Sequence, residues 1–446
     1  MKKNTYLFLL ILISLVALSL RLWKLDSIPP SLNWDEAAFG YNAYSILKTT
    51  RNEYGNFLPL APIYVYLTVP SVALFGLTEF AVRFPAALFG ALSVFLIYFV
   101  VQELFKEFEG KKFLGILTSV VLAVSPWSYH YSHSAWEINV FLVLLLLTFI
   151  FFLKAKKKIR NYLIVFLIFG FLALLVVNFI SVAQEENGSP FNYYLREITE
   201  RYLNHFSPRF LFFEGDWSNL MNHLDILLLP LGAFFLISRK IKNQSFLWYI
   251  LLVAPLPAAL SRDVIQATRS FFMIIPLTII SAFGVYFIWE KVAKTRKLLK
   301  IGIISVLIFG YIFSFVYYLD QFFVHAPIQN SQYWQYGYKE VVKFVKDKTG
   351  NYDKVVFTQK YGQPYIYWLF YTKYDPQKYQ SQAKLIDNIQ FRDIYWPKDR
   401  FIKKTLYVGG PYELPKEDIV EGQSRLLKEI NFLSGETAFR IVETIK

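Results

Sequence analysis

The chain of 446 residues is 55% hydrophobic and 19% aromatic, and 18% of its residues are charged. Because roughly a quarter of the residues of soluble domains are charged, this composition indicates an integral membrane protein and excludes a single soluble core. The net charge of +14 does not indicate nucleic-acid binding, since Lys and Arg gather in short clusters between apolar segments. Cysteine is absent, which excludes disulfide bonds and thiolate chemistry.

Nine apolar segments are candidates for membrane-spanning helices, each of which needs roughly 20 residues. In chain order they cover 5–21, 84–105, 113–128, 138–153, 161–181, 223–238, 245–260, 271–289 and 301–319. The first segment also fits a secretory signal peptide, because Ala17-Leu18-Ser19 offers a small-x-small cleavage site. Both interpretations leave the topology of the later segments unchanged.

Basic clusters orient these segments in the membrane. They occupy alternate connections, at Lys2 and Lys3, 106–112, 154–160, 238–244 and 290–300. By the positive-inside rule these connections face the cytoplasm. We therefore expect a multi-pass protein of the plasma (inner) membrane with a cytoplasmic N-terminus and an extracytoplasmic C-terminal domain.

The opposite, outer side receives the long connections and the tail. In the first connection, 22–83, Asn33-x-x-Glu36 predicts a helix that starts with a capping box and ends near Pro59 and Pro62. The apolar segment 63–77 is interrupted by Pro70, which favours an interfacial or re-entrant helix over a full span.

The tail predicts a small α/β domain, so that residues 1–320 form the membrane module and 321–446 an extracytoplasmic domain. Helices are expected over 338–350 and 362–374, and strands over 353–359, 404–410 and 438–445. The tail holds no metal, phosphate or catalytic motif. A packing or partner-binding role is therefore expected for it.

Four stretches carry a resemblance to a known family. They are "WDEAAFGYNAYSILKT" from Trp34, "EFAVRFPAALFGALSVFLIYFVVQELF" from Glu79, "SPWSYHYSHSAWEINVFLVLLLL" from Ser125 and "LPAALSRDVIQATRSFFMIIPL" from Leu256. With this topology the chain resembles the GT-C membrane glycosyltransferases, in particular the dolichyl-phosphate-mannose protein mannosyltransferase-like group (glycosyltransferase family 39 and its bacterial relatives). The resemblance implies a polytopic α-helical membrane protein of GT-C type, with about nine spans here and a small C-terminal α/β extracytoplasmic domain.

The resemblance also implies a reaction. A sugar would pass from a polyprenyl-phosphate-linked donor to a hydroxyl of a protein, lipid or glycan acceptor at the outer face, with inversion and without a resident cofactor. The chain is shorter than relatives by a helix pair after the fourth segment. That region helps to shape the lipid or acceptor site in relatives, so the resemblance does not indicate which acceptor this chain uses. Two alternatives remain open, a flippase or transporter of a lipid-linked sugar and a non-catalytic membrane scaffold that displays the tail.

Two acidic residues match catalytic positions of the family. Asp35 matches the general base, although an aspartate in the first turn of a helix is also favoured by the helix dipole. Glu137 matches the second acidic position, although Ser134-x-x-Glu137 also reads as a capping box.

Substrate-binding roles are assigned to Glu36, His130 and His133. Glu36 also fits the capping box with Asn33. The two histidines would share a helical face with Glu137, a spacing that suits a metal, but hydrogen bonding to sugar or phosphate is expected and no metal is assigned.

Two arginines lie on the outer side, against the charge bias of the chain. Arg262 and Arg269 offer planar guanidinium groups that suit a phosphate. The alternatives are an ion pair of Arg262 with Asp263 and contact of Arg269 with lipid headgroups. We expect both arginines to bind the donor.

Overall fold

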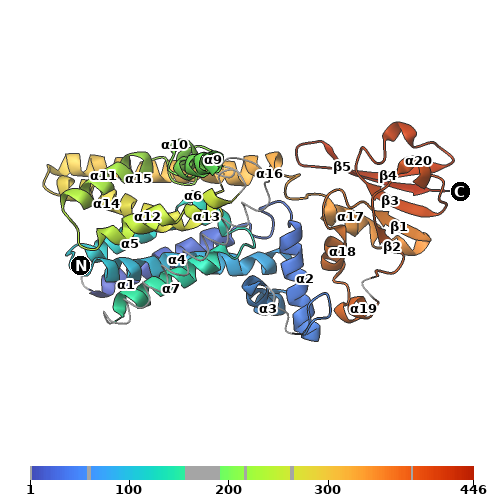
Figure 1. The fold of residues 1–446 in the computed structure, drawn as a ribbon, viewed down its shortest axis with the longest axis horizontal. Helices are drawn as coiled ribbons and strands as arrows, with labels where there is room; N and C mark the ends of the chain where they lie inside the picture. Colours follow the sequence, from blue (N-terminus) through green and yellow to red (C-terminus); the bar gives the residue numbers. More distant parts are fainter. Residues whose placement is uncertain are drawn as a thin grey trace. The chain divides into compact units, whose positions relative to one another are not determined.

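The computed structural model describes residues 3–57, 62–155, 191–214, 218–261, 266–382 and 385–445. The chain forms two compact units (Figure 1). Unit 1 comprises Met1–Arg21, Leu88–Ser132 and Ile138–Phe322, and unit 2 comprises Leu22–Ala87, His133–Glu137 and Phe323–Lys446. Unit 2 thus joins the first long connection to the tail, an association that the sequence did not indicate. The predicted boundary at residue 320 stays a prediction.

Unit 1 is a bundle of helices. Its elements are α1 (Lys3–Leu22), most of α4 (Glu79–Leu104), α5 (Lys111–Ala123), α6 (Pro126–Tyr131), α7 (Ile138–Lys154), α9 (Phe191–Asn204), α10 (Pro208–Phe212), α11 (Asp225–Ser238), α12 (Gln244–Val253), α13 (Leu256–Leu260), η1 (Phe271–Met273), α14 (Ile274–Val292), α15 (Lys297–Asp320) and the start of η2 (Gln321–His325). In the part of the chain that the structure describes, four helices are long and apolar enough to cross a membrane, over Asn4–Leu22, Glu79–Leu104, Phe271–Val292 and Lys297–Gln329.

Most of the predicted segments correspond to helices, with two differences. The segment 113–128 is not one helix, because α5 ends at Ala123 and α6 starts anew at Pro126, after an extended Ser125. Proline has no N–H to continue a helix but suits the first turn of the next one. Segment 245–260 is divided between α12 and α13. The segment 161–181 lies outside the described residues.

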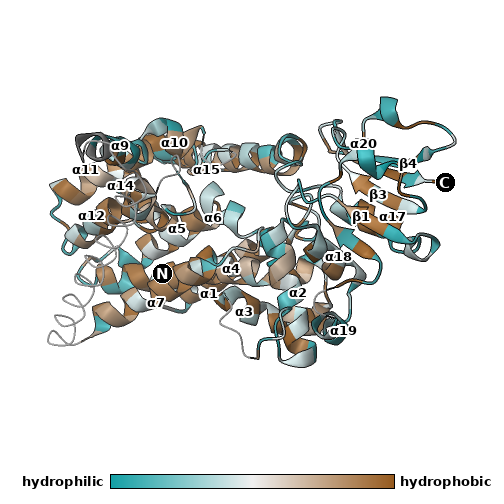
Figure 2. Cartoon of the chain, turned by 45° about the vertical axis from the view of Figure 1, so that its right-hand side comes forward, coloured by the Kyte–Doolittle hydropathy of each residue, from teal (hydrophilic) through white to brown (hydrophobic). Residues whose placement is uncertain are grey.

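The helices of unit 1 are rich in hydrophobic residues (Figure 2). In α15 the side chains of Leu298, Val306 and Phe309 are 84%, 67% and 68% exposed. So many exposed apolar side chains would be unfavourable in water. They are expected on the outer face of a helix that is surrounded by lipid.

Two glycines allow α11 and α14 to cross closely. A side-chain carbon at Gly232 of α11 would collide with the carbonyl oxygen of Ile280, and one at Gly284 of α14 with that of Leu228. Small residues at such crossings let helix backbones approach, which is how helices pack where lipid replaces water.

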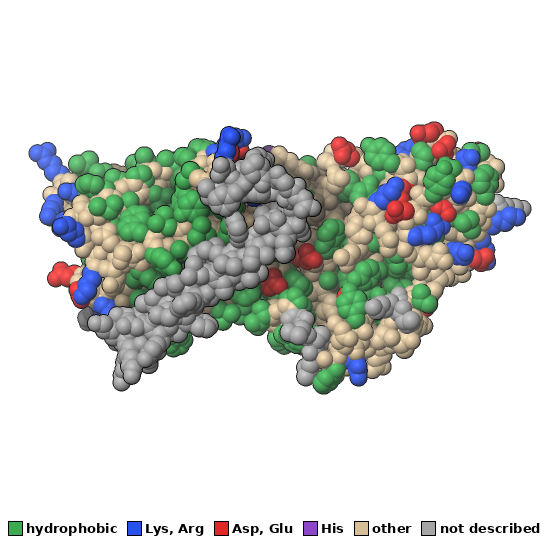
Figure 3. All heavy atoms as spheres, in the orientation of Figure 1, with side chains coloured by type: hydrophobic (Ala, Val, Ile, Leu, Met, Phe, Trp, Pro, Cys, Tyr) green, Lys and Arg blue, Asp and Glu red, His purple; other side chains and the backbone are tan. Residues whose placement is uncertain are grey.

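The basic connections meet at one end of unit 1, as the topology prediction requires. Four of the five clusters are joined there by ion pairs between helix ends, which are Lys242 with Glu107, Lys154 Nζ with Glu103 Oε1 at 3.9 Å, and Arg239 with Glu290 at 3.0 Å. Figure 3 shows Lys and Arg side chains gathered toward one end of this unit. These four clusters therefore share one end of unit 1, and whether that end faces the cytoplasm stays a prediction.

The opposite helix ends are joined by a buried arginine. Arg21, at the end of α1, donates hydrogen bonds to Ser132 Oγ at 3.1 Å and to Ser128 Oγ at 3.0 Å. It also donates to the carbonyl oxygen of Ala123, the last residue of α5, at 3.3 Å. The ends of α1, α5 and α6 thus form a second, separate end of the bundle.

Unit 2 contains two helices of the first connection, α2 (Trp34–Thr49) and α3 (Ile63–Phe75), and the folded tail. The tail has the helices α16 (Ala326–Gln329), α17 (Tyr338–Val345), α18 (Pro364–Thr372), α19 (Pro376–Ser381) and α20 (Trp396–Asp399) and the strands β1 (Lys354–Phe357), β2 (Ile389–Phe391), β3 (Thr405–Gly409), β4 (Ser424–Asn431) and β5 (Thr437–Thr444), with the short 3-10 turns η3 (Thr349–Asn351) and η4 (Lys416–Asp418). The strand order is β2-β1-β3-β5-β4. Strands β2, β1 and β3 run parallel, while β5 is antiparallel to both neighbours.

The predicted α/β character of the tail is confirmed, since all three expected strands and both expected helices form. Helix α2 starts at the predicted N-cap, but it ends at Thr49, well before Pro59 and Pro62. Thr50 ends it by adopting a left-handed conformation, with φ of 57°. The prediction that the prolines end this helix was therefore wrong.

Candidate functional site

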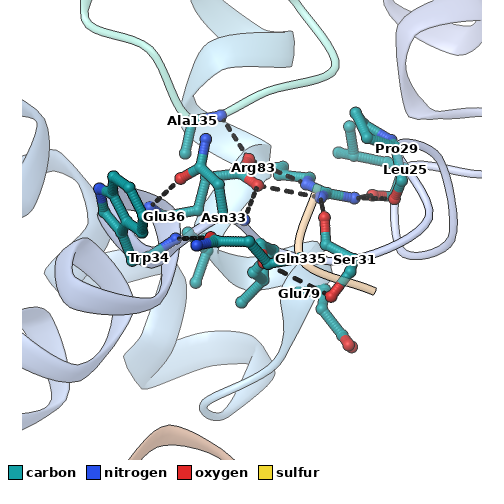
Figure 4. A network of polar contacts seen from close by, with 12 residues as sticks. Leu25, Pro29, Ser31, Asn33, Trp34, Glu36, Glu79, Arg83, Ala135 and Gln335 are labelled. Carbon is teal, nitrogen blue, oxygen red and sulfur yellow. Dashed lines mark hydrogen bonds and ion pairs between the residues drawn. The ribbon is translucent and has the colours of Figure 1, made fainter. Parts of the chain in front are cut away.

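The start of α2 is fixed by a capping box. Asn33 Oδ1 accepts a hydrogen bond from the Glu36 N–H at 2.8 Å, and Glu36 Oε2 accepts one from the Asn33 N–H at 3.3 Å (Figure 4). The two residues thereby satisfy N–H groups that a helix start leaves without partners. The predicted capping box is confirmed.

Glu36 also forms a buried two-point ion pair with Arg83 of α4. Arg83 Nε lies 3.0 Å from Glu36 Oε1, and Arg83 Nη2 lies 3.0 Å from Oε2. The Arg83 and Glu36 side chains are 0% and 1% exposed. The other guanidinium N–H groups donate to backbone carbonyls, those of Leu25, Pro29 and Ser31. A buried pair is tolerated where hydrogen bonds saturate both partners, as they do here.

The same carboxylate holds the segment that precedes α7. The Ala135 N–H donates to Glu36 Oε1 at 2.8 Å, so the chain two residues before Glu137 is fastened to the start of α2 (Figure 4). These contacts account for Glu36 as a structural residue. Its predicted substrate-binding role stays a prediction.

Asp35, the predicted base, reaches solvent from the first turn of α2. Loss of hydration in its partly enclosed setting raises the pKa of Asp35, the neighbouring Glu36 carboxylate raises it further, and a hydrogen bond with the Trp34 side chain opposes the change. A carboxylate with a raised pKa is a stronger proton acceptor, which suits a general base. The immobilised neighbours of Asp35 fix its backbone while its side chain stays accessible.

Glu137 lies just before α7 and is partly exposed. The alternative capping-box interpretation was wrong, because α7 begins only at Ile138 and the buried Ser134 hydroxyl has no hydrogen-bond partner. Glu137 is therefore not accounted for as a cap. Its predicted catalytic role remains untested.

The predicted helical face of His130, His133 and Glu137 does not form. Helix α6 ends at Tyr131, so His130 is helical while His133 lies in the turn that follows. His133 is fully buried, and its Nε2 lies 3.2 Å from the carbonyl oxygen of Trp23. The described residues contain no group of three His, Asp or Glu side chains placed to hold a metal ion.

Of the two predicted arginine ligands, Arg269 lies among the described residues and Arg262 does not. Arg269 is exposed, in the turn that precedes η1. Arg262 and its alternative partner Asp263 lie outside the described residues. The phosphate-binding roles of both arginines stay predictions.

Sequence reasoning missed two residues that organise the site. Arg83 lies at the start of an apolar segment, and a buried cation there signals a paired acidic residue elsewhere. Gln335 accepts a hydrogen bond from the Trp34 N–H at 2.9 Å and donates one to the Tyr361 carbonyl oxygen at 3.0 Å. It ties the start of α2 to the tail across 301 residues, a contact that no local pattern predicts.

The chain is similar to known proteins in sequence and in fold. Residues 59–181 match the family model described as dolichyl-phosphate-mannose-protein mannosyltransferase. The crystal structure of apo ArnT from Cupriavidus metallidurans is 13% identical, with a TM-score of 0.53 and 97% of each chain covered. The structure of the same protein bound to undecaprenyl phosphate is 14% identical, with a TM-score of 0.50 and the same coverage. No curated protein matches the chain.

These findings confirm the resemblance seen in the sequence and the predicted fold class. The fold is that of ArnT, a GT-C membrane protein, with a small sheet-containing C-terminal region. The chain is accordingly a multi-pass membrane protein. The number of spans and their orientation stay predictions.

Proposed function

We propose that the protein is a glycosyltransferase that moves a sugar from a polyprenyl-phosphate donor to an acceptor hydroxyl at the outer face of the membrane. The matched family is one of mannosyltransferases, and ArnT, which shares the fold, binds undecaprenyl phosphate. Both support a donor whose lipid lies in the bilayer and whose phosphate-sugar lies at its surface.

Asp35 is the general base of the proposed reaction. This role is supported by the setting of Asp35: its carboxylate is accessible, its pKa is raised, and it lies at a rigid helix start. The neighbouring Glu36 is engaged in a buried ion pair with Arg83. As the acceptor hydroxyl attacks the anomeric carbon, Asp35 takes its proton, and the bond to the phosphate oxygen breaks with inversion. Cationic groups such as Arg269 stabilise the charge that develops on the departing phosphate.

Glu137 orients hydroxyl groups of donor or acceptor in this mechanism. The Ala135–Glu36 hydrogen bond keeps its segment attached to the start of α2, which bears Asp35. Asp35 transfers the proton, and Glu137 acts through hydrogen bonds that hold the reacting groups in line.

A membrane assay tests the reaction class. Membranes with wild type, Asp35→Asn or Asp26→Asn receive radiolabelled polyprenyl-phosphate hexoses and a crude acceptor extract, and label leaving the lipid is followed. Asp26 is an exposed aspartate of the same first connection, so it controls for the loss of a negative charge. We expect label to move to the acceptor with wild type and Asp26→Asn but not with Asp35→Asn.

Two other outcomes would reject the proposal. Movement of intact lipid-linked sugar across the vesicle membrane without any transfer product would support a flippase. Absence of both transfer and movement, with several sugars and a verified acceptor, would support a scaffold.

A further inference from the structure

We propose that a pocket in unit 2, here called the aromatic pocket, binds a neutral oligosaccharide that serves as the acceptor. The pocket has a volume of about 470 Å³ and is lined by residues of α2 and of the folded tail. This volume lies within the roughly 300–1,000 Å³ range of small-molecule sites. The inference rests on the proposed function and names the acceptor that this function leaves open.

The lining has the composition of a sugar site. Seven of the twelve lining residues are aromatic and three are glutamines. Aromatic rings offer flat apolar faces for the C–H face of a sugar ring, while a glutamine amide both donates and accepts hydrogen bonds, as a sugar hydroxyl does. Gln335 already bonds Trp34 and Tyr361, so the argument applies to Gln332 and Gln359. An apolar ligand would displace water from these two amides without replacing its hydrogen bonds, at a cost in free energy.

The charge of the lining favours a neutral ligand. Lys360 is the one charged residue among those that line the pocket, and its Nζ lies 3.9 Å from Glu413 Oε1. Glu413 is buried and accepts hydrogen bonds from the N–H groups of Ile394 and Gly410, which hold its side chain in place beside the lysine. A phosphate or an acidic glycan would find no net positive charge here.

The pocket has a rigid floor and an accessible rim. Tyr338 and Phe439 are 1% and 2% exposed, and Tyr338 stacks on Tyr367 with ring centroids 4.2 Å apart. At the rim, the Tyr333 side chain is 60% exposed, and Gln359 is exposed as well. Preformed aromatic surface of this kind loses little conformational entropy when a ligand binds.

The pocket is joined directly to the residue proposed as the base. Trp34, which lines the pocket, is the residue immediately before Asp35, and Gly362 lies so close to the indole that a side-chain carbon would collide with it. Gln335, another lining residue, holds the Trp34 N–H. An oligosaccharide seated here is therefore held by the same helix start that presents Asp35.

Binding is tested on the full chain in lipid nanodiscs, with the Asp35→Asn variant so that no turnover occurs. The probes are neutral mannose, glucose and N-acetylglucosamine trisaccharides, with a serine- and threonine-rich peptide as the comparison. Tyr333→Ala and Gln359→Ala alter the rim, and Tyr412→Ala, at a tyrosine that is 95% exposed and absent from the lining, is the matched control. Thermal unfolding verifies that each variant is folded.

We expect at least one trisaccharide to bind the Asp35→Asn protein. Tyr333→Ala and Gln359→Ala each weaken its binding by about tenfold, and Tyr412→Ala leaves it unchanged. With Asp35 restored, the rim substitutions raise the KM for the acceptor by a similar factor and leave kcat unchanged, because they do not touch the reacting atoms. A loss of fold would instead lower kcat and the unfolding temperature together.

The failure of this inference is distinguishable from failure of the proposed function. Asp35-dependent transfer with no trisaccharide binding and an unaltered acceptor KM in the rim variants would overturn the aromatic pocket alone. Binding of the peptide only would also overturn it. Trisaccharide binding that depends on Tyr333, without transfer from any lipid donor, would support the pocket and reject the proposed reaction.

Discussion

At the residue scale, the Glu36–Arg83 pair carries a strong stability prediction. Glu36→Gln leaves the guanidinium of Arg83 buried without a countercharge, and breaking a buried pair in this way costs about 3–5 kcal/mol. We expect a clear loss in the temperature of unfolding, measured on the purified protein in detergent. Replacing both residues with apolar side chains of similar size should cost less than Glu36→Gln alone. Equal unfolding temperatures for wild type and Glu36→Gln would contradict the structural role.

The pH dependence of the reaction tests the environment of Asp35. A protonated Asp35 accepts no proton, so kcat/KM falls as pH drops through its pKa, which lies above the ordinary value of about 3.9. The acid limb of the pH profile should therefore be displaced upward from that value. Asp26→Asn should preserve the wild-type limb. A wild-type limb at or below the ordinary value would argue against Asp35 as the titrating base.

At the element scale, the crossing of α11 and α14 should tolerate no added side chain. Gly232→Ala and Gly284→Ala each place a carbon against a backbone carbonyl of the facing helix. A contact of this kind forces the helices apart and costs about 1–3 kcal/mol. Gly302→Ala in α15 is the matched control, because an added carbon there meets nothing within 4 Å. Similar unfolding temperatures for all three variants would show that the helices do not cross this closely.

The elements that sequence reasoning found are those with strong local signals. The start of α2 follows from Asn33 and Glu36, β1 and β3 are mostly apolar, and β5 contains two buried apolar pairs. Strand β2 was missed because it has three residues, and β4 because its mixed polar pattern is that of an edge strand with partly exposed side chains. The separation of α5 from α6 was missed because the apolar segment was extended across Ser125 and Pro126, where the helix breaks.

The candidate site was only partly predictable for a related reason. Asp35 and the capping box lie within a few residues of one another, and the family resemblance singles them out. The bonds of Arg83 and Gln335 join segments 47 and 301 residues apart, so only the folded chain reveals them. The expected helical face shared by His130, His133 and Glu137 did not form because helical periodicity was assumed across a helix end.

At the scale of the whole molecule, the orientation in the membrane is testable because the chain has no cysteine. Lys242→Cys marks the basic end of unit 1, and Tyr412→Cys marks the exposed surface of the tail. With intact cells and a membrane-impermeant maleimide, we expect labelling of Tyr412→Cys only, since the positive-inside rule places Lys242 in the cytoplasm. Permeabilised cells should label both. Labelling of Lys242→Cys but not of Tyr412→Cys in intact cells would show that the chain has the opposite orientation in the membrane.

The role of Asp35 as the base is tested most directly by the rate constant for sugar transfer in a single turnover. Purified wild type, Asp35→Asn and Asp26→Asn are compared in nanodiscs with a defined polyprenyl-phosphate hexose. Removal of a general base lowers the rate by about 10²–10⁴-fold. We expect a loss of that size for Asp35→Asn, with unchanged donor binding, and a wild-type rate for Asp26→Asn. Equal rate constants for Asp35→Asn and wild type would exclude Asp35 as the general base.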